Sequence, residues 1–209
     1  MRLREVAAAT FLAEFKAQYL LAATFMRLQE YYESPLRGFH GRHFTHEQYM
    51  DAYAAKYGNF TYTVDWAGFN VPGNIVARFF SLFRDLNRKE TALHEAMLPV
   101  MERRGDRFYL VGSTSGDPDT LKHEMAHAFY YLDPEYKREM DAITAGWPQA
   151  DSFRKALARK GYRPSVARDE TQAYMATSSK VWLTKWTGLR LAIPPMYRRV
   201  FSAKYKGRP

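Results

Sequence analysis

Apolar residues recur at helical spacing in three stretches of the N-terminal half of the chain. Residues 3–33 are rich in Ala and Leu at this period and predict a first helix. Residues 45–58 predict a second helix, because Thr45 is a favourable N-cap residue and Gly58 can end the helix. Residues 74–101 return to the helical pattern and predict a third helix.

Two other segments are rich in β-branched and aromatic residues and are bounded by turn residues. Residues 59–73 predict a strand followed by a loop, and residues 107–116 predict a compact strand. The sequence contains no internal repeat. Several helices with few strands predict a helix-rich α+β fold with a small sheet.

A helix start is predicted just after the second strand. Asp117 can cap the helix, Pro118 fits its first position, and the pattern continues to Leu132 before an Asp-Pro pair. Residues 133–147 predict another helix, and residues 148–162 predict a connector.

Composition and charge limit the classes of protein to consider. A chain of 209 residues that is 46% hydrophobic can bury one core and does not need two domains. The net charge of +9 is compatible with nucleic acid, an anionic membrane surface or an acidic protein. Residues 196–209 are strongly basic and predict a solvated C-terminal tail.

The chain lacks two features that would change this picture. No stretch has the ~18 apolar residues of a membrane span, and charged residues interrupt the N-terminal apolar segment before it reaches the length of a signal peptide. We therefore expect a cytoplasmic protein. There is no cysteine, which excludes disulfides, thiolate metal ligands and a cysteine nucleophile.

The segment "HEMAH" at residues 123–127 carries the strongest chemical signal. Residues four apart lie on one face of a helix, so His123 and His127 can both reach one zinc ion at ~2.0–2.1 Å. Glu124 lies roughly 100° around the helix, beside the ion but not as its ligand. It is therefore the candidate general base for a water molecule in the open position of the zinc.

Two alternatives do not involve catalysis. His123 and His127 can be structural side chains on a half-buried helix, although their ring nitrogens would then need other partners. The protein can also be a basic module that binds nucleic acid or a protein partner. Zinc content separates these interpretations from the metalloenzyme.

The motif over residues 120–133 resembles that of the zincin metallopeptidases, whose active-site helix carries His-Glu-x-x-His. The resemblance implies one zincin-like domain over residues 1–209, which binds one zinc ion and hydrolyses peptide bonds in a protein or peptide. Residues 1–115 would supply N-terminal helices and edge strands, and residues 116–209 the metal-binding helices and the basic tail. In zincins, an edge strand at the position of residues 107–116 pairs with the extended substrate.

The resemblance offers two candidates for the third zinc ligand. The metzincin pattern places it at Asp133, but this pattern needs a glycine where the chain has Tyr130. The gluzincin pattern takes a glutamate from a later helix. A helix opening near Pro164 places Glu170 on one face with Ala173, and we prefer Glu170.

The chain departs from the thermolysin-like pattern at the position four residues after the ligand glutamate. Thermolysin-like zincins have there a carboxylate that orients a zinc histidine, whereas this chain has Tyr174. Its hydroxyl can hydrogen-bond an imidazole or stabilise the tetrahedral intermediate, so Tyr174 is the second catalytic candidate; a packed core tyrosine is the alternative. Asp169 is another carboxylate available to orient a histidine.

The remaining histidines do not predict a second metal site. His40, His43 and His46 are three residues apart, but Gly41 and the cap at Thr45 interrupt a helix there.

Overall fold

The computed structural model describes residues 1–206, which contain eleven helices and four strands. The prediction of a helix-rich α+β fold with a small sheet is confirmed. The chain divides into two compact units, of which the first is Met1–Leu121 and the second begins at Lys122. A single zincin-like domain over the whole chain stays a prediction.

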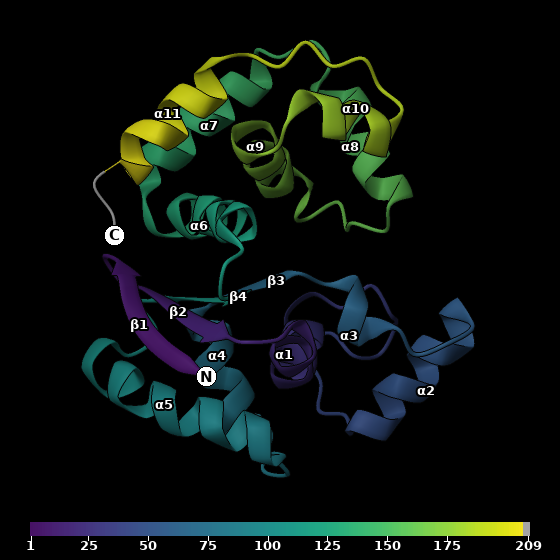
Figure 1. The fold of residues 1–209 in the computed structure, drawn as a ribbon, viewed down its shortest axis with the longest axis vertical. Coiled ribbons are helices and arrows are strands. Elements are labelled where there is room, and N and C mark those ends of the chain that lie inside the picture. The colour runs from purple at the N-terminus through teal and green to yellow at the C-terminus, as the bar shows by residue number, and fades with distance from the viewer. Residues whose placement is uncertain (207–209) are drawn as a thin grey trace. The chain divides into compact units, whose positions relative to one another are not determined.

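The first unit contains a mixed sheet of four strands (Figure 1). The spatial order is β1 (Arg2–Ala7), β2 (Thr10–Phe15), β4 (Tyr109–Thr114) and β3 (Gly68–Pro72). The two central strands, β2 and β4, are parallel, and each outer strand runs antiparallel to its neighbour.

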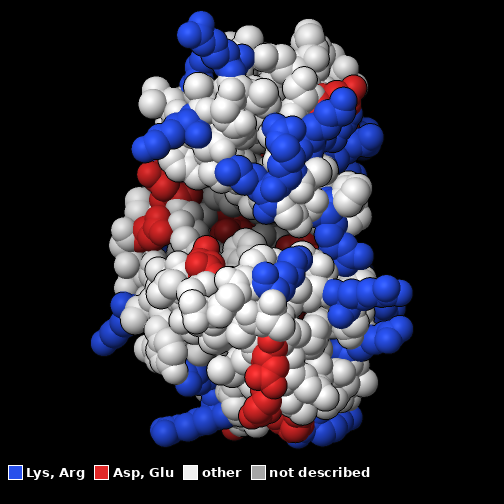
Figure 2. Space-filling view, turned by 90° about the vertical axis from the view of Figure 1, so that its right-hand side faces the viewer, with Lys and Arg blue, Asp and Glu red and all other residues white. Residues whose placement is uncertain are grey.

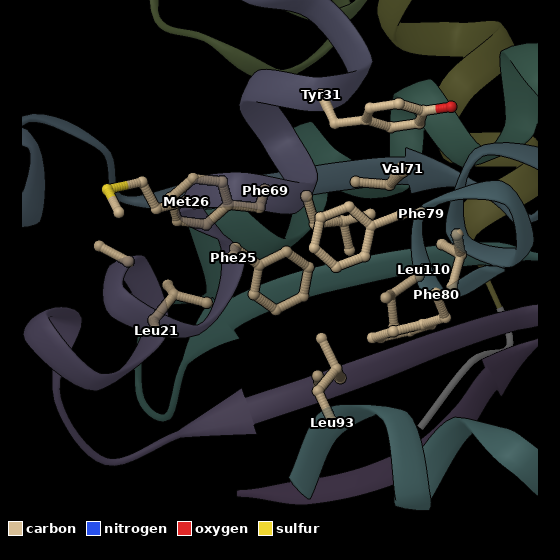
Figure 3. Packing of buried hydrophobic residues seen from close by; sticks show 14 of the residues in the cluster. Leu21, Phe25, Met26, Tyr31, Phe69, Val71, Phe79, Phe80, Leu93 and Leu110 are labelled. Atoms are coloured by element: carbon tan, nitrogen blue, oxygen red, sulfur yellow. The ribbon is translucent and has the colours of Figure 1, made fainter. Parts of the chain in front are cut away.

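Helices of the first unit pack on one face of this sheet and form an aromatic core with it. The five helices of the first unit are α1 (Gln18–Glu33), α2 (His46–Tyr57), α3 (Tyr62–Asp65), α4 (Gly73–Leu82) and α5 (Arg88–Arg104). Side chains from α1 and α4 meet those of β3 and β4 in the core, where Phe25 stacks on Phe69 (Figure 3). Gly112 permits this approach, since a Cβ there would lie 2.8 Å from atoms of Leu21 and Phe25.

The prediction of a first helix over residues 3–33 is wrong for its N-terminal part. Two strands precede α1, and they are joined at Ala9, which has a φ of 57°. Strand β2 lies between β1 and β4, and five of its six residues are buried. A strand buried on both faces reads as a continuous apolar run, which periodicity does not distinguish from a helix.

Two further predictions need correction in the middle of the first unit. Residues 59–73 form the short helix α3 and then strand β3, so the strand lies where a loop was predicted. Residues 74–101 form α4 and α5 rather than one helix. The separation occurs because Asn87 and Glu90 make a capping box that begins α5. The helix over residues 45–58 is confirmed as α2, with Thr45 as its N-cap and Gly58 as its C-cap.

The second unit is helical in its described part. Its helices are α6 (Pro118–Leu132), α7 (Pro134–Ala145), α8 (Ala150–Arg159), α9 (Ala167–Thr177), α10 (Lys180–Thr187) and α11 (Met196–Tyr205), of which α6 begins in the last residues of the first unit. Helix α9 is central, since α7, α8 and α11 all pack on it (Figure 1). The ends predicted for α6 are confirmed: Asp117 accepts a hydrogen bond from the Thr120 amide, and the helix ends at Leu132.

Two segments of this unit are more ordered than predicted. The connector over residues 148–162 contains helix α8, which buries Phe153 and Leu157. The predicted basic tail contains helix α11, because Tyr197 and Phe201 are one turn apart and both are buried. The tail's last residues, 207–209, lie outside the described residues. No helix in residues 1–206 combines the length and apolar character of a membrane span.

Candidate metal centre

Helix α6 places the two histidines of "HEMAH" on one face. The Nε2 atoms of His123 and His127 lie 3.3 Å apart, and the two rings meet nearly edge to face. Two donors that each lie ~2.0–2.1 Å from one zinc ion at a tetrahedral angle are roughly 3.3–3.4 Å apart. The separation of the nitrogens therefore fits two ligands of a single ion.

Helix α9 brings Glu170 to the same point. Glu170 Oε2 lies 3.8 Å from His123 Nε2, and Glu170 Oε1 lies 3.8 Å from His127 Nε2. One donor atom from each of His123, His127 and Glu170 lies within 4.8 Å of the other two, and this group can hold one metal ion. We call these three residues the metal centre.

The outward-facing nitrogen of each imidazole also lies close to a polar side chain of α9. His127 Nδ1 lies 2.9 Å from Asp169 Oδ1, and His123 Nδ1 lies 3.3 Å from Thr177 Oγ1. The Thr177 hydroxyl donates to the Ala173 carbonyl, which leaves its oxygen to accept from the imidazole. Contacts of this kind fix the orientation of a ligating histidine and direct Nε2 to the metal.

Gln172 connects α6, α7 and α9 behind the metal centre. Its Nε2 donates to Asp169 Oδ1 and to the Ala126 carbonyl of α6, at 2.9 and 3.2 Å. Its Oε1 accepts a hydrogen bond from the Tyr136 hydroxyl of α7. Because Gln172 is fully buried, these bonds hold Asp169 and both helices in a fixed relation.

The burial of Glu170 is unusual for a carboxyl group. Only 8% of the residue is exposed, and Oε2 has no hydrogen-bond partner among the described residues. Burial raises the pKa of Glu170 to about 8; the charge of His127 lowers this pKa, while Asp169 and Glu124 raise it. A cation between the carboxylate and the two imidazoles would satisfy this oxygen, so the residues present fit a metal ion.

The pKa values of the two histidines are shifted in opposite directions. Burial lowers the pKa of His123 well below its ordinary value, and the neighbouring His127 lowers it further. Burial also lowers the pKa of His127, but the carboxylates of Asp169 and Glu170 outweigh it and raise this pKa to about 10. The negative carboxylate groups therefore act mainly on His127. Together these carboxylates would offset the charge of a divalent ion.

Glu124 and Tyr174, the two predicted catalytic residues, both lie next to the metal centre. Glu124 is buried, and its charge raises the pKa of both His127 and Glu170. The Tyr174 ring lies against His123, with 4.6 Å between ring centroids. Its hydroxyl is 2.7 Å from that of Tyr162, and burial raises the pKa of Tyr174 above its ordinary value.

The structure separates the two candidates for the third ligand. Glu170 meets the histidines, whereas Asp133 caps α7 by accepting hydrogen bonds from the amides of Glu135 and Tyr136. Asp133 also pairs with Lys204 of α11. Gln172 and Tyr162 were not identified from the sequence, because an isolated glutamine and an isolated tyrosine carry no signal of their place in the fold.

The expectation that residues 107–116 form an edge strand is wrong. Strand β4 lies between β2 and β3 and has a paired strand on each side. The reason is that β2, predicted as helix, occupies one flank. A central strand has no free main-chain groups with which to pair a substrate.

Two of the other four histidines belong to a hydrogen-bonded cluster in the first unit. His43 Nε2 lies 2.9 Å from Asp85, and His46 Nε2 lies 3.3 Å from Glu90. Among the described residues, the metal centre is the one group of His, Asp and Glu side chains arranged to hold an ion.

Comparisons with known proteins found no relative. No family model matches the chain, and neither a curated protein nor a solved structure matches it.

Proposed function

We propose that this protein is a zinc-dependent hydrolase of peptide bonds, with His123, His127 and Glu170 as the zinc ligands. The observation that carries the proposal is the buried Glu170 carboxylate, whose unpartnered oxygen lies 3.8 Å from a histidine Nε2. If the histidines were only structural, this oxygen would be buried at a cost and without a partner.

The set of donor atoms favours zinc in a catalytic role. Two imidazole nitrogens and one carboxylate oxygen are donors that zinc accepts, and structural zinc sites usually have four ligands with cysteines among them. The chain contains no cysteine. Three protein ligands leave one position for a substrate or a water molecule, which is the catalytic arrangement.

The chemistry that zinc supplies is that of a Lewis acid, which polarises a carbonyl group and makes a water molecule more acidic. Glu124 follows His123 in α6 and is buried beside the ligands. In the proposed reaction, its carboxylate takes the proton of the attacking water and delivers it to the nitrogen of the leaving amine. The bond broken is the amide C–N bond, and the products are a carboxylate and an amine.

The Tyr162 and Tyr174 hydroxyls give the site a source of hydrogen bonds. They lie 2.7 Å apart, so one donates to the other and the second proton is available to an acceptor. Burial keeps both groups protonated at neutral pH by raising the pKa of each. We assign the available proton to the oxygen on which negative charge develops during hydrolysis.

The test combines metal analysis with a search for cleavage. The purified protein should bind about one zinc ion per chain, as three protein ligands imply. Wild type and Glu124→Gln are then incubated with a proteome-derived peptide library, and new termini are identified by mass spectrometry. We expect Glu124→Gln to retain zinc and to cut roughly 10²–10⁴-fold more slowly, because the amide cannot accept a proton.

Two outcomes would count against the proposal. Protein that binds no transition metal after zinc is supplied at neutral pH is not a metalloenzyme of this kind. Termini that form equally with wild type and Glu124→Gln come from a contaminating protease, and zinc-loaded wild type that forms none beyond this background is not a general peptidase.

A further inference from the structure

The net positive charge of the chain comes from one part of it. Residues 1–121 contain 14 Lys or Arg and 14 Asp or Glu, whereas residues 122–209 contain 17 and 8. The formal charge of +9 therefore belongs entirely to the second unit. Such an uneven distribution produces a strong local potential, whereas the same charge spread evenly would not.

The basic residues of the second unit are not matched by acidic residues on its surface. After Asp151, the only acidic residues in the sequence are Asp169 and Glu170, which are occupied at the metal centre. On the face drawn in Figure 2, several Lys and Arg side chains gather in the upper part of the view. Six exposed basic residues on and next to α8 and α10 have no carboxylate partner among the described residues: Lys155, Arg159, Lys160, Lys180, Lys185 and Arg190.

An aromatic cluster lies among these charges. Trp182 and Trp186, one turn apart on α10, stack with 5.1 Å between ring centroids and an interplanar angle of 18°. Trp182 also stacks on Tyr174 of α9, at 5.9 Å and 20°. Lys160 lies over the ring of Trp186, 5.6 Å from its centroid. The cluster thus joins planar rings and positive charge on one surface.

Trp182 is held in place although much of it is exposed. Its amide donates to the hydroxyl of Ser179, which caps α10, and the buried Leu183 anchors the helix. Yet 45% of Trp182 is exposed, as is 80% of the adjacent Val181. A large aromatic side chain that is fixed on a helix, stacked with two other rings and still 45% exposed is suited to receive another planar ring.

We propose that the surface formed by α8 and α10 binds single-stranded nucleic acid, with a base stacked on Trp182 and phosphates contacted by Lys180 and Lys185. Aromatic platforms in a basic surface are the usual means of binding single strands. A duplex keeps its bases stacked inside, and an acidic peptide or an anionic membrane would use the charges but not the parallel rings. The proposal does not rest on the hydrolysis proposed above, although Tyr174 contacts both Trp182 and His123.

The first test measures affinity for a fluorescein-labelled oligothymidylate by anisotropy at several salt concentrations. Trp182→Ala should weaken binding roughly 5- to 150-fold, the equivalent of the ~1–3 kcal/mol that stacking of one base supplies. Trp66→Ala is the matched control, since Trp66 is 39% exposed and lies in the first unit. It should leave the affinity unchanged. Trp182→Phe keeps an aromatic ring and should retain most of the affinity.

The second test examines the phosphate contacts. Lys180→Gln combined with Lys185→Gln should reduce the slope of log Kd against log salt by about 1.4, because each phosphate contact on a single strand contributes ~0.7. Lys16→Gln combined with Lys56→Gln changes the charge equally in the first unit, where both lysines are exposed. This control should keep the slope of the wild type.

The outcomes are decisive because binding is measured without substrate cleavage. Absence of binding at low salt would overturn the proposal, as would equal losses for Trp182→Ala and Trp66→Ala. Polyglutamate or anionic vesicles that displace the oligonucleotide, and that bind with the same dependence on Trp182, would show that the surface has a different ligand. Cleavage of peptides by a protein that binds no oligonucleotide would leave the metal centre proposal intact and remove this one.

Discussion

Glu170 owes its position in the metal centre to its neighbours rather than to any local sequence signal. An acidic residue in the first turn of a helix is common and is usually exposed. Here Glu170 is buried, and its carboxylate faces two imidazoles of α6. The resulting arrangement predicts different behaviour for Glu170 and for Asp133, the other candidate ligand.

Glu170→Ala removes one of three proposed ligands and should weaken zinc binding by more than 100-fold, since loss of a group that only orients a ligand already costs about 10- to 100-fold. Asp133→Ala should keep the zinc affinity and lower the free energy of unfolding by about 1 kcal/mol, because Asp133 caps α7. Competition with a chromophoric chelator measures the first quantity, and denaturant unfolding the second. The reverse ranking of zinc affinities would exclude Glu170 as a ligand.

Much of the metal centre was accessible from the sequence, but the groups that orient it were only partly so. The four-residue spacing of His123 and His127 predicted a shared ion without knowledge of the fold. Glu170 required a resemblance to a family pattern. The role of Gln172 depends on Tyr136 of α7 and on a carbonyl of α6, and no local pattern encodes such contacts.

At the scale of elements, α2, α6 and strand β4 were predicted from local signals, whereas β2 was predicted as helix and the capping box that begins α5 was missed. Helix α6 has Asp117 and Pro118 at its start, and α2 has a capping box, so both were placed correctly. Strand β2 has no local signal, since its identity depends on pairing with β4, almost 100 positions away in the sequence. Non-local pairing of this kind overrides a local helical pattern.

A buried ion pair connects α1 to α5. The guanidinium of Arg27 donates through Nε to Glu90 Oε1 at 2.8 Å and also binds the other oxygen of the same carboxylate. Arg27 also contacts Asp85, half-exposed before α5, at 3.0 Å. Burial raises the pKa of Glu90, but hydrogen bonds from Arg27 and His46 outweigh it, so this pKa lies below its ordinary value.

This pair predicts how the stability of the first unit depends on pH. Because the pKa of Glu90 is lower in the folded than in the unfolded chain, its contribution is complete above the unfolded value, near 4.3, and is lost as the pH falls through the folded value. Glu90→Gln should lower the free energy of unfolding at neutral pH by about 3–5 kcal/mol, because Arg27 stays buried without its partner. Glu90→Gln should also reduce the loss of unfolding free energy that occurs as the pH falls.

Denaturant unfolding followed by circular dichroism between neutral pH and about pH 3 covers the range of these carboxyl pKa values. Glu95→Gln is the control, since Glu95 is exposed on the same helix and should change the stability by less than about 0.5 kcal/mol. An equal acid dependence in Glu90→Gln and wild type would mean that the pair does not control acid stability.

For the whole molecule, composition predicted the amount of charge but not its location. The sequence total of +9 was compatible with many partners. Only the division at Lys122 shows that one unit is neutral overall and the other carries the excess. The metal centre lies in the charged unit, and this location yields a prediction for the chain as a whole.

Zinc should stabilise the second unit by binding its native state alone, by about 4 kcal/mol when free zinc is 1,000 times Kd. Hydrogen exchange followed by mass spectrometry should therefore slow in α6 and α9 when zinc is added. The amides of β2 and β4 serve as an internal reference in the first unit and should change little. Uniform slowing along the chain, or none in α9, would contradict a site built from α6 and α9.

The absence of sulfur from the metal centre has a consequence for oxidative stress. Peroxide converts cysteine thiolates to sulfenic and then sulfinic acids, which no longer ligate zinc as thiolates do. Two imidazoles and a carboxylate do not undergo this chemistry. A zinc ion held by His123, His127 and Glu170 would therefore stay bound under oxidant concentrations that empty thiolate sites, and in reducing and oxidising compartments alike.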